Sequence, residues 1–312
     1  MANKTQSKIK ICTINICGLS NRSKMVLNKY SYDEELDAIA VQEVDTGTEN
    51  LPNLELLNMS VITDTNKGKN KGAALYVNNK HSITKLDNIS EISKNLDSCW
   101  GLVVMCKKRY IIGSIYVKLN HKPAVSEIMK MLDAAEKKKT EHKASGIILM
   151  GDFNARHCSW GDNINNYYGT QLAETLDSTK YSICTPKTPT FLCTNGKSHI
   201  DLNIISNSIA ESVDSCVTDD HVELFSGSPT RGHVPVITEL LITREYSHQS
   251  VVEKLDLTKM QWENWTQSIE RKIEEDNNVT IESNPYIVWE NLNQIITEAT
   301  DTYCQTKKMF KT

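Results

Sequence analysis

Short apolar runs bounded by polar turns fill the first part of the chain, and most of these runs have the length of a strand. The strand candidates are residues 8–15, 37–44, 72–77, 101–106, 110–117, 145–150, 200–205, 212–218, 222–225 and 235–241. Residues 23–36 and 125–139 instead space their apolar positions as a helix does. Strands mixed with two or three helices predict an α/β fold that contains both parallel and antiparallel pairs.

The pattern changes after Leu241. Residues 243–250 are polar and predict a linker, whereas residues 262–275 and 286–303 have helical spacing and many charges. We therefore predict two parts: a strand-rich domain over residues 1–242, and a linker with a small helical tail over residues 243–312.

Composition indicates a soluble globular protein, because 39% of the 312 residues are hydrophobic and 24% are charged. The longest apolar runs have the length of a strand and fall far short of a membrane span, so no membrane partner is expected. The nine cysteines include no Cys-x-x-Cys pair, and their odd number favours reduced thiols over a disulfide framework.

The net charge is −4, but net charge does not describe the local field of a cleft. Three basic clusters occur, at Lys67, Lys69 and Lys71, at Lys107, Lys108 and Arg109, and at Lys137, Lys138 and Lys139. The simpler interpretation of each is a solvated surface, and a DNA-binding groove is the alternative. Charge alone does not identify the substrate.

Four apolar strands are expected to finish in polar residues: Asn15, Glu43, the pair Asp152 and Asn154, and Asp201. Side chains two apart on a strand share a face, so Asp152 and Asn154 are expected at one site. Oxygen ligands of this kind suit Mg²⁺ or Mn²⁺. A histidine, His233, precedes another strand and could orient or protonate a phosphate. The set predicts metal-assisted hydrolysis of a phosphodiester.

Each of these residues also has a structural interpretation. A Gly-Asp-x-Asn sequence is commonly a turn, and Asn15, Tyr116 and Asp201 taken singly are ordinary polar residues at strand ends. Glu43 could lie on the surface, and His233 could be a hydrogen-bonded structural histidine. The order and context of the whole set favour the functional hypothesis.

Six segments resemble, in the same order, the motifs of the endonuclease/exonuclease/phosphatase superfamily. They are Thr13-Ile14-Asn15-Ile16-Cys17-Gly18-Leu19, Val41-Gln42-Glu43, Gly113-Ser114-Ile115-Tyr116, Gly151-Asp152-Phe153-Asn154-Ala155, Ser198-His199-Ile200-Asp201-Leu202 and Gly232-His233-Val234-Pro235-Val236. The resemblance covers residues 8–242. Trp160-Gly161-Asp162 and Pro189-Thr190-Phe191 are similar to the endonucleases of LINE-type (non-LTR) retrotransposons, and the tail resembles the stretch that leads towards their reverse transcriptase.

The resemblance implies a four-layered α/β sandwich of two mixed β-sheets flanked by helices. It also implies a role for each site residue. Glu43, helped by Asn15, would hold the Mg²⁺ or Mn²⁺ ion, and Asp152 would orient or deprotonate the attacking water.

Around these, Asn154 would position the water or the phosphate, and Tyr116 would touch the phosphate or the leaving oxygen. His233, oriented by Asp201, would contact the phosphoryl oxygen.

The implied activity is a metal-dependent nick in double-stranded DNA that leaves a 3′-hydroxyl, which primes reverse transcription during retrotransposition. Element RNA would be an indirect partner through the rest of a polyprotein. Genomic DNA as substrate would imply a nuclear location.

Two positions depart from the superfamily pattern. Cys17 stands where an acidic or amide residue is common, and Gly232 stands where an aspartate usually precedes the histidine. Gly232 is either a missing carboxylate or a glycine that its backbone conformation requires. A catalytically weakened or inactive DNA-binding copy is therefore an alternative, as is an abasic-site repair nuclease or phosphatase of the same superfamily.

Overall fold

The computed structural model describes residues 6–44, 54–64, 72–93, 96–119, 121–194, 196–219, 232–243, 251–255, 257–275, 285–304 and 306–310. The chain forms two compact units: the N-terminal unit, Thr5–Arg244, and the C-terminal unit, Glu245–Thr312 together with Met1–Lys4. The predicted strand 222–225, residues 244–250 of the predicted linker and the cluster Lys67, Lys69 and Lys71 lie outside the described residues.

Two six-stranded sheets form the N-terminal unit. The first has the order β13-β15-β1-β2-β4-β3, with β1 Gln6–Asn15, β2 Ala38–Gln42, β3 Met59–Asp64, β4 Ala73–Asn78, β13 Val213–Thr218 and β15 Val236–Thr243. The second has the order β5-β6-β7-β8-β12-β9, with β5 Ser82–Lys85, β6 Asp97–Met105, β7 Lys108–Tyr116, β8 Gly146–Asp152, β9 Tyr181–Cys184 and β12 Asp201–Ser206. Each sheet is mixed, because β1 pairs with β2 and β7 with β8 in parallel, and its other pairs among the described strands are antiparallel.

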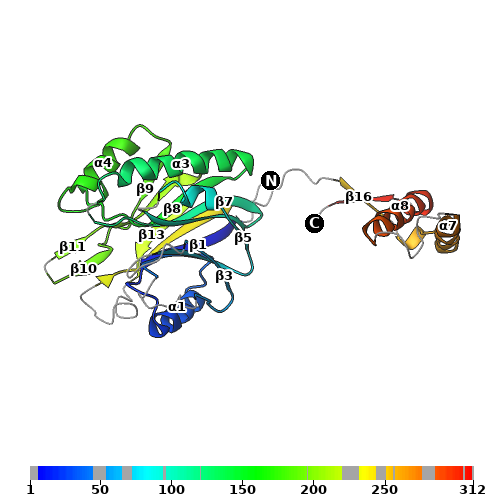
Figure 1. Cartoon of the computed structure of the whole chain (residues 1–312), viewed down its shortest axis with the longest axis horizontal. Coiled ribbons are helices and arrows are strands. Elements are labelled where there is room, and N and C mark those ends of the chain that lie inside the picture. The colour runs from blue at the N-terminus through cyan, green and yellow to red at the C-terminus, as the bar shows by residue number, and fades with distance from the viewer. Residues whose placement is uncertain are drawn as a thin grey trace. The chain divides into compact units, whose positions relative to one another are not determined.

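Helices cover the outer face of each sheet (Figure 1). Helices α3 (Ala124–Glu141) and α4 (Tyr167–Leu176) lie over the second sheet, and α1 (Asn21–Asp33) lies over the first. The shorter elements are α2 Asp87–Ser90, η1 Cys158–Trp160 and α5 Asn207–Ala210. The predicted four-layered α/β sandwich is confirmed.

Three apolar clusters hold the layers together. One lies between the two sheets, one joins α3 and α4 to the second sheet, and one joins α1 to the first. Central strands such as β2 and β8 are therefore buried on both faces. Burial on both faces explains why these strands are continuous apolar runs in the sequence and do not alternate with polar residues.

A third, small sheet has the order β11-β10-β14, with β10 Phe191–Cys193, β11 Gly196–Ser198 and β14 Gly232–His233. The sequence pattern did not predict it.

Helix α1 also ends earlier than predicted, at Asp33, because Glu35 adopts a left-handed conformation (φ 52°) that turns the chain into β2.

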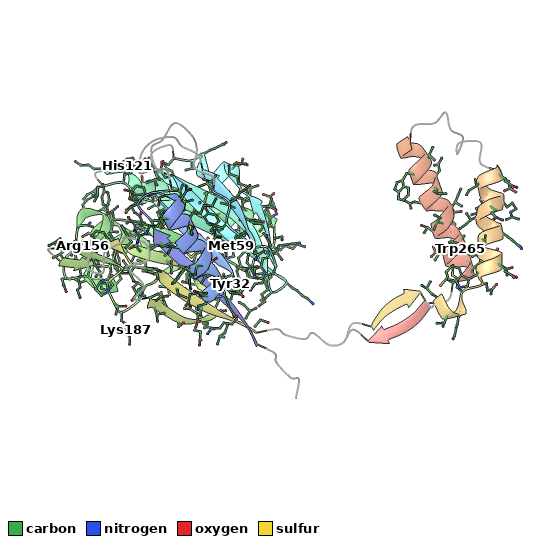
Figure 2. The ribbon with its side chains drawn as sticks, turned by 90° about the horizontal axis from the view of Figure 1, so that it is seen from below. Tyr32, Met59, His121, Arg156, Lys187 and Trp265 are labelled. Carbon is green, nitrogen blue, oxygen red and sulfur yellow. The ribbon has the colours of Figure 1, made fainter. Side chains whose placement is uncertain are left out.

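The C-terminal unit contains the two predicted helices, α7 (Trp262–Glu275) and α8 (Pro285–Tyr303). They pack side by side, and the indole of Trp265 on α7, labelled in Figure 2, donates a hydrogen bond to Thr300 Oγ1 on α8 (3.1 Å). A short helix η2 (Leu257–Lys259) and an antiparallel pair of strands, β16 (Val251–Leu255) and β17 (Thr306–Phe310), complete it. None of the described helices combines the length and apolar character needed to cross a bilayer.

Candidate active site

The predicted site residues meet where strands of the two large sheets end. Asn15 ends β1, Glu43 follows β2, Tyr116 ends β7 and Asp152 ends β8. The Asn15 amide nitrogen donates hydrogen bonds to Glu43 Oε1 (2.9 Å) and to Asp152 Oδ2 (3.0 Å). Because Asn15 and Glu43 belong to the first sheet and Asp152 to the second, this amide joins the two sheets at the site.

Asp201 was predicted to lie at the end of its strand, but it lies at the start, as the first residue of β12. Since β12 runs antiparallel to β8, the start of β12 lies beside the end of β8, and Asp201 is paired directly with Asp152. The prediction that a strand finishes at Asp201 was therefore wrong. Asp201 still lies in the site, because β12 and β8 are antiparallel neighbours in one sheet.

His233, on β14, is held by Asp201. Its Nδ1 lies 3.0 Å from both carboxylate oxygens of Asp201, and its Nε2 lies 3.8 Å from Asp152 Oδ2. The Phe191 ring packs against the imidazole, with the ring centroids 4.7 Å apart. All three ionisable groups are buried. The imidazole is thus fixed in one orientation, with Nε2 turned towards Asp152.

This arrangement shifts two pKa values. Burial raises the pKa of Asp152 to about 7, with His233 opposing the rise and Asp201 adding to it. Burial lowers the pKa of His233, but the adjoining Asp201 carboxylate outweighs burial and raises that pKa to about 9. Near neutral pH the imidazole is therefore a cation and hydrogen-bond donor, while Asp152 can take up a proton.

Glu43 and Tyr116 form the other side of the site. Glu43 adopts a left-handed conformation (φ 53°) just after β2, and its side chain is buried. The Tyr116 hydroxyl donates a hydrogen bond to its carboxylate. Burial, together with the Glu43 carboxylate, raises the pKa of Tyr116 far above its ordinary value, so the phenol stays protonated.

Asn154 lies beside Asp152, but not through strand alternation as we predicted, because β8 ends at Asp152. Asn154 is left-handed (φ 49°), and its backbone N–H donates to Asp152 Oδ1 (2.9 Å). Its side-chain amide donates to the Val117 carbonyl oxygen (2.8 Å). Asn154 therefore fixes the Asp152 carboxylate and the turn after β7.

The charge of the site fits a divalent cation. Glu43, Asp152 and Asp201 are buried carboxylates, and among the described residues none of them forms an ion pair with lysine or arginine. Even with His233 protonated, the cluster carries excess negative charge, which is costly to bury without a cation. Its oxygen donors match the preference of Mg²⁺ and Mn²⁺.

The hydrogen bonds indicate which groups are available to that cation. Donor atoms of Asp152, Asp201 and His233 lie within 4.8 Å of one another, but both Asp201 oxygens already accept from His233. The Asn15 amide oxygen accepts from the Cys17 N–H (3.0 Å), and its nitrogen faces the two carboxylates. Glu43 likewise accepts from Asn15 and from Tyr116, so the ligand roles of Glu43 and Asn15 both stay predictions.

The two residues that depart from the superfamily pattern, Cys17 and Gly232, have different structural explanations. Gly232 has φ 133°, a conformation that residues with a Cβ rarely adopt, so the backbone explanation accounts for this glycine. Cys17 is left-handed as well (φ 50°) and exposed. Partial desolvation and the Glu43 carboxylate raise the pKa of the Cys17 thiol to about 11, so it adds no negative charge to the site near neutral pH.

Several supporting residues had no predicted role. Thr190 Oγ1 accepts hydrogen bonds from the N–H groups of Ile200 and Asp201 (both 3.0 Å). Asn166 caps α4 and donates to the Asn154 carbonyl oxygen (2.8 Å). The Pro-Thr-Phe motif and the capping asparagine were visible in the sequence, but their partners lie 10 to 12 residues away and depend on the fold.

The Trp160-Gly161-Asp162 segment is also supporting structure. The Asp162 carboxylate binds the Arg156 guanidinium through several hydrogen bonds (2.8–3.1 Å) and accepts from the His199 N–H (2.9 Å). The buried Trp160 indole donates to the Ala155 carbonyl oxygen (3.3 Å). These contacts fix the loop that follows Asp152.

The two described basic clusters lie away from the site. Residues 107–109 are at the start of β7, and Tyr116 ends this nine-residue strand, about 27 Å further on. Arg109 Nη1 donates to the His142 carbonyl oxygen (3.1 Å), which puts the end of α3, and with it residues 137–139, at the same far end. The solvated-surface interpretation of both clusters fits this position.

Comparison with known proteins gives one family match. Residues 110–227 match a family model described as "Endonuclease-reverse transcriptase". No curated protein sequence matches the chain.

Solved structures share the fold at low sequence identity. The endonuclease domain of TRAS1, a telomere-specific non-LTR retrotransposon, has a TM-score of 0.61 at 16% identity, covering 75% of this chain and 98% of that one. The AP endonuclease LMAP from Leishmania major has a TM-score of 0.57 at 15% identity, covering 75% and 87%. An endonuclease/exonuclease/phosphatase from Bacteroides vulgatus has a TM-score of 0.54 at 13% identity, covering 76% and 100%. Residues 110–227 are therefore similar in sequence to the endonuclease-reverse transcriptase family, and the fold of the chain is the one shared by these endonuclease/exonuclease/phosphatase structures.

Proposed function

We propose that the N-terminal unit is a metal-dependent endonuclease that nicks double-stranded DNA and leaves a 3′-hydroxyl. The observation that carries the proposal is the Asn15 amide, which holds Glu43 and Asp152 together beside the Asp201–His233 pair. The family description and the likeness to a retrotransposon endonuclease domain support this choice among phosphodiesterases.

Each side chain has a part in the hydrolysis. Glu43 would hold a divalent ion, which supplies charge neutralisation and polarisation at the scissile phosphate. Asp152 takes a proton from the attacking water, and the His233 cation donates a hydrogen bond to a phosphoryl oxygen. Water adds to phosphorus, the bond to O3′ breaks and O3′ takes up a proton from solvent, giving a 5′-phosphate and a 3′-hydroxyl.

The same proposal extends to the biological setting. The 3′-hydroxyl would prime reverse transcription, element RNA would be an indirect partner, and genomic DNA as substrate implies a nuclear location. The C-terminal unit would be the stretch that leads towards a reverse transcriptase.

A plasmid assay tests the activity. Supercoiled plasmid incubated with the full chain and Mg²⁺ or Mn²⁺ should yield open circles, and a chelator should stop the reaction. A DNA polymerase should extend the nicks without prior phosphatase treatment, because extension requires a free 3′-hydroxyl. Open circles that a polymerase cannot extend would refute the proposed cleavage chemistry.

A second candidate is an abasic-site nuclease, which the fold likeness to the Leishmania AP endonuclease favours. Two oligonucleotide duplexes that differ only by one abasic-site analogue separate the candidates. Cleavage confined to the abasic duplex would favour repair. Binding of both duplexes without cleavage, at any metal concentration, would favour an inactive DNA-binding copy.

A further inference from the structure

Two cysteines that the proposed function does not use face each other across the two large sheets. Cys184 ends β9 and Cys216 lies in β13, and these are the edge strands of the second and first sheets. Both thiols are half-buried. The inner neighbours of these cysteines are Asn203 on β12, paired with Cys184, and Thr238 on β15, paired with Cys216.

Hydrogen bonds draw this group together. The thiols of Cys184 and Cys216 are hydrogen-bonded to each other. Thr238 Oγ1 donates to Cys216 Sγ (3.3 Å), and the amide nitrogen of Asn203 lies 4.0 Å from the same sulfur and 2.8 Å from Thr238 Oγ1. Cys216 Sγ is therefore an acceptor with three donors around it.

A second contact fixes the same two segments. The hydroxyl groups of Thr188, four residues after Cys184, and Thr218, two residues after Cys216, are hydrogen-bonded to each other. The loop that leaves β9 and the end of β13 are thus in contact at two points along their length. Two anchored segments give the sulfurs little freedom to separate, which favours bond formation between them.

We propose that Cys184 and Cys216 form a redox-active dithiol, which a peroxide oxidises to a disulfide that joins the two sheets. The inference is independent of the proposed nuclease activity. All nine cysteines lie in described segments and are free thiols, so the dithiol is the form that the structure shows.

The chemistry starts at Cys216. The hydrogen bond from Cys184 lowers the pKa of Cys216, burial opposes this, and the donors on Thr238 and Asn203 lower it further. The Cys216 thiolate attacks one peroxide oxygen and the O–O bond breaks, giving a sulfenic acid and, with one proton, water. The Cys184 thiol then attacks that sulfur, which forms the disulfide and releases a second water. Two electrons pass from the sulfurs to the peroxide.

The test uses the full chain and does not need activity. The protein is treated with limiting hydrogen peroxide, remaining thiols are alkylated, and peptides are mapped by mass spectrometry without reduction. We expect one cross-linked peptide pair containing Cys184 and Cys216, with two of the nine thiols lost. The melting temperature should rise by roughly 10 °C and fall back with dithiothreitol, since the cross-link closes a loop of about 30 residues.

Matched variants locate the effect. Cys184→Ser and Cys216→Ser should abolish both the cross-link and the reversible shift in melting temperature. Cys193→Ser should behave as wild type, because Cys193 is equally half-buried but its thiol donates to the Gly196 carbonyl oxygen (3.3 Å). If a serine variant fails to fold, the peptide map of the oxidised wild-type protein still shows whether Cys184 and Cys216 are cross-linked. Oxidation of the exposed Cys17 or Cys158, with Cys184 and Cys216 recovered as alkylated thiols, would overturn the proposal.

Discussion

At the scale of single residues, Asp152 and His233 lie next to each other in the site but differ in pKa, about 7 for Asp152 and about 9 for His233. Replacing either by alanine should reduce plasmid nicking by at least about 10²-fold, the size expected for a lost acid–base or electrostatic group. The fold should persist, because both side chains lie at strand ends and outside the three apolar clusters. Circular dichroism and a nicking time course measure the two effects.

The matched control is Asp177→Ala, which removes an exposed carboxylate at the end of α4. It should nick at the wild-type rate. Wild-type rates in the Asp152 and His233 variants as well would remove the site assignment.

Substitutions of Gly232 test whether this position needs a glycine for its backbone conformation or lacks a carboxylate for the metal. Because its φ is 133°, Gly232→Ala and Gly232→Asp should both lower the free energy of unfolding, by about 1–3 kcal/mol each. Neither should lower the Mg²⁺ concentration needed for half-maximal nicking. Denaturant titration and a metal titration of the two variants measure this. A lower Mg²⁺ requirement in the aspartate variant alone would show that a carboxylate is missing after all.

At the scale of elements, Thr190 connects the small third sheet to the site. Its hydroxyl accepts from Ile200 and Asp201, while its carbonyl oxygen accepts from the Val234 N–H (2.7 Å). Thr190→Val keeps the shape but leaves two buried N–H groups without their acceptor, which should cost about 1–3 kcal/mol of stability. Nicking should fall about tenfold as Asp201 moves.

Thr190→Ser is the matched variant, since it keeps the hydroxyl and loses only a methyl group. It should retain most of the nicking rate. Equal rates in the serine and valine variants would show that the hydroxyl does not position Asp201.

The sequence predicted the central strands because their apolar runs are continuous and end in polar residues, as β8 does at Asp152. It did not predict β9, β10 or β11, which have three or four residues and are only partly buried. Such strands owe their existence to pairing with distant segments. Helix α4 was missed too, although Asn166 caps it, because its first residues are two tyrosines with no helical pattern before them.

The site was predicted as a set of residues but not as a geometry. Asp201 was assigned to the wrong end of its strand, because the direction of β12 relative to β8 is a property of the sheet. The contacts of Asn154 and Thr190 also depend on chain segments that meet only after folding. The order of the motifs along the chain therefore identified the residues of the site, whereas their contacts with one another depend on how the strands pair in the sheets.

At the scale of the whole molecule, every predicted site residue lies in the unit Thr5–Arg244. A chain that ends at Arg244 should therefore fold and nick plasmid within about twofold of the full chain. Its melting temperature should stay within a few degrees, because each unit has its own contacts. Differential scanning calorimetry and the plasmid assay measure this. A large fall in melting temperature together with lost nicking would show that the C-terminal unit stabilises the N-terminal unit.

The left-handed residues around the site have a consequence for evolution. Glu43 and Asn154 both have φ near 50°, a conformation that glycine adopts at lower cost, and Glu43 also buries a carboxylate among others. Glu43→Gly should therefore raise the free energy of unfolding of the metal-free protein by about 1 kcal/mol while abolishing nicking. A library of variants sorted for thermal stability alone would lose Glu43 early. Only selection for the proposed nicking activity would keep it.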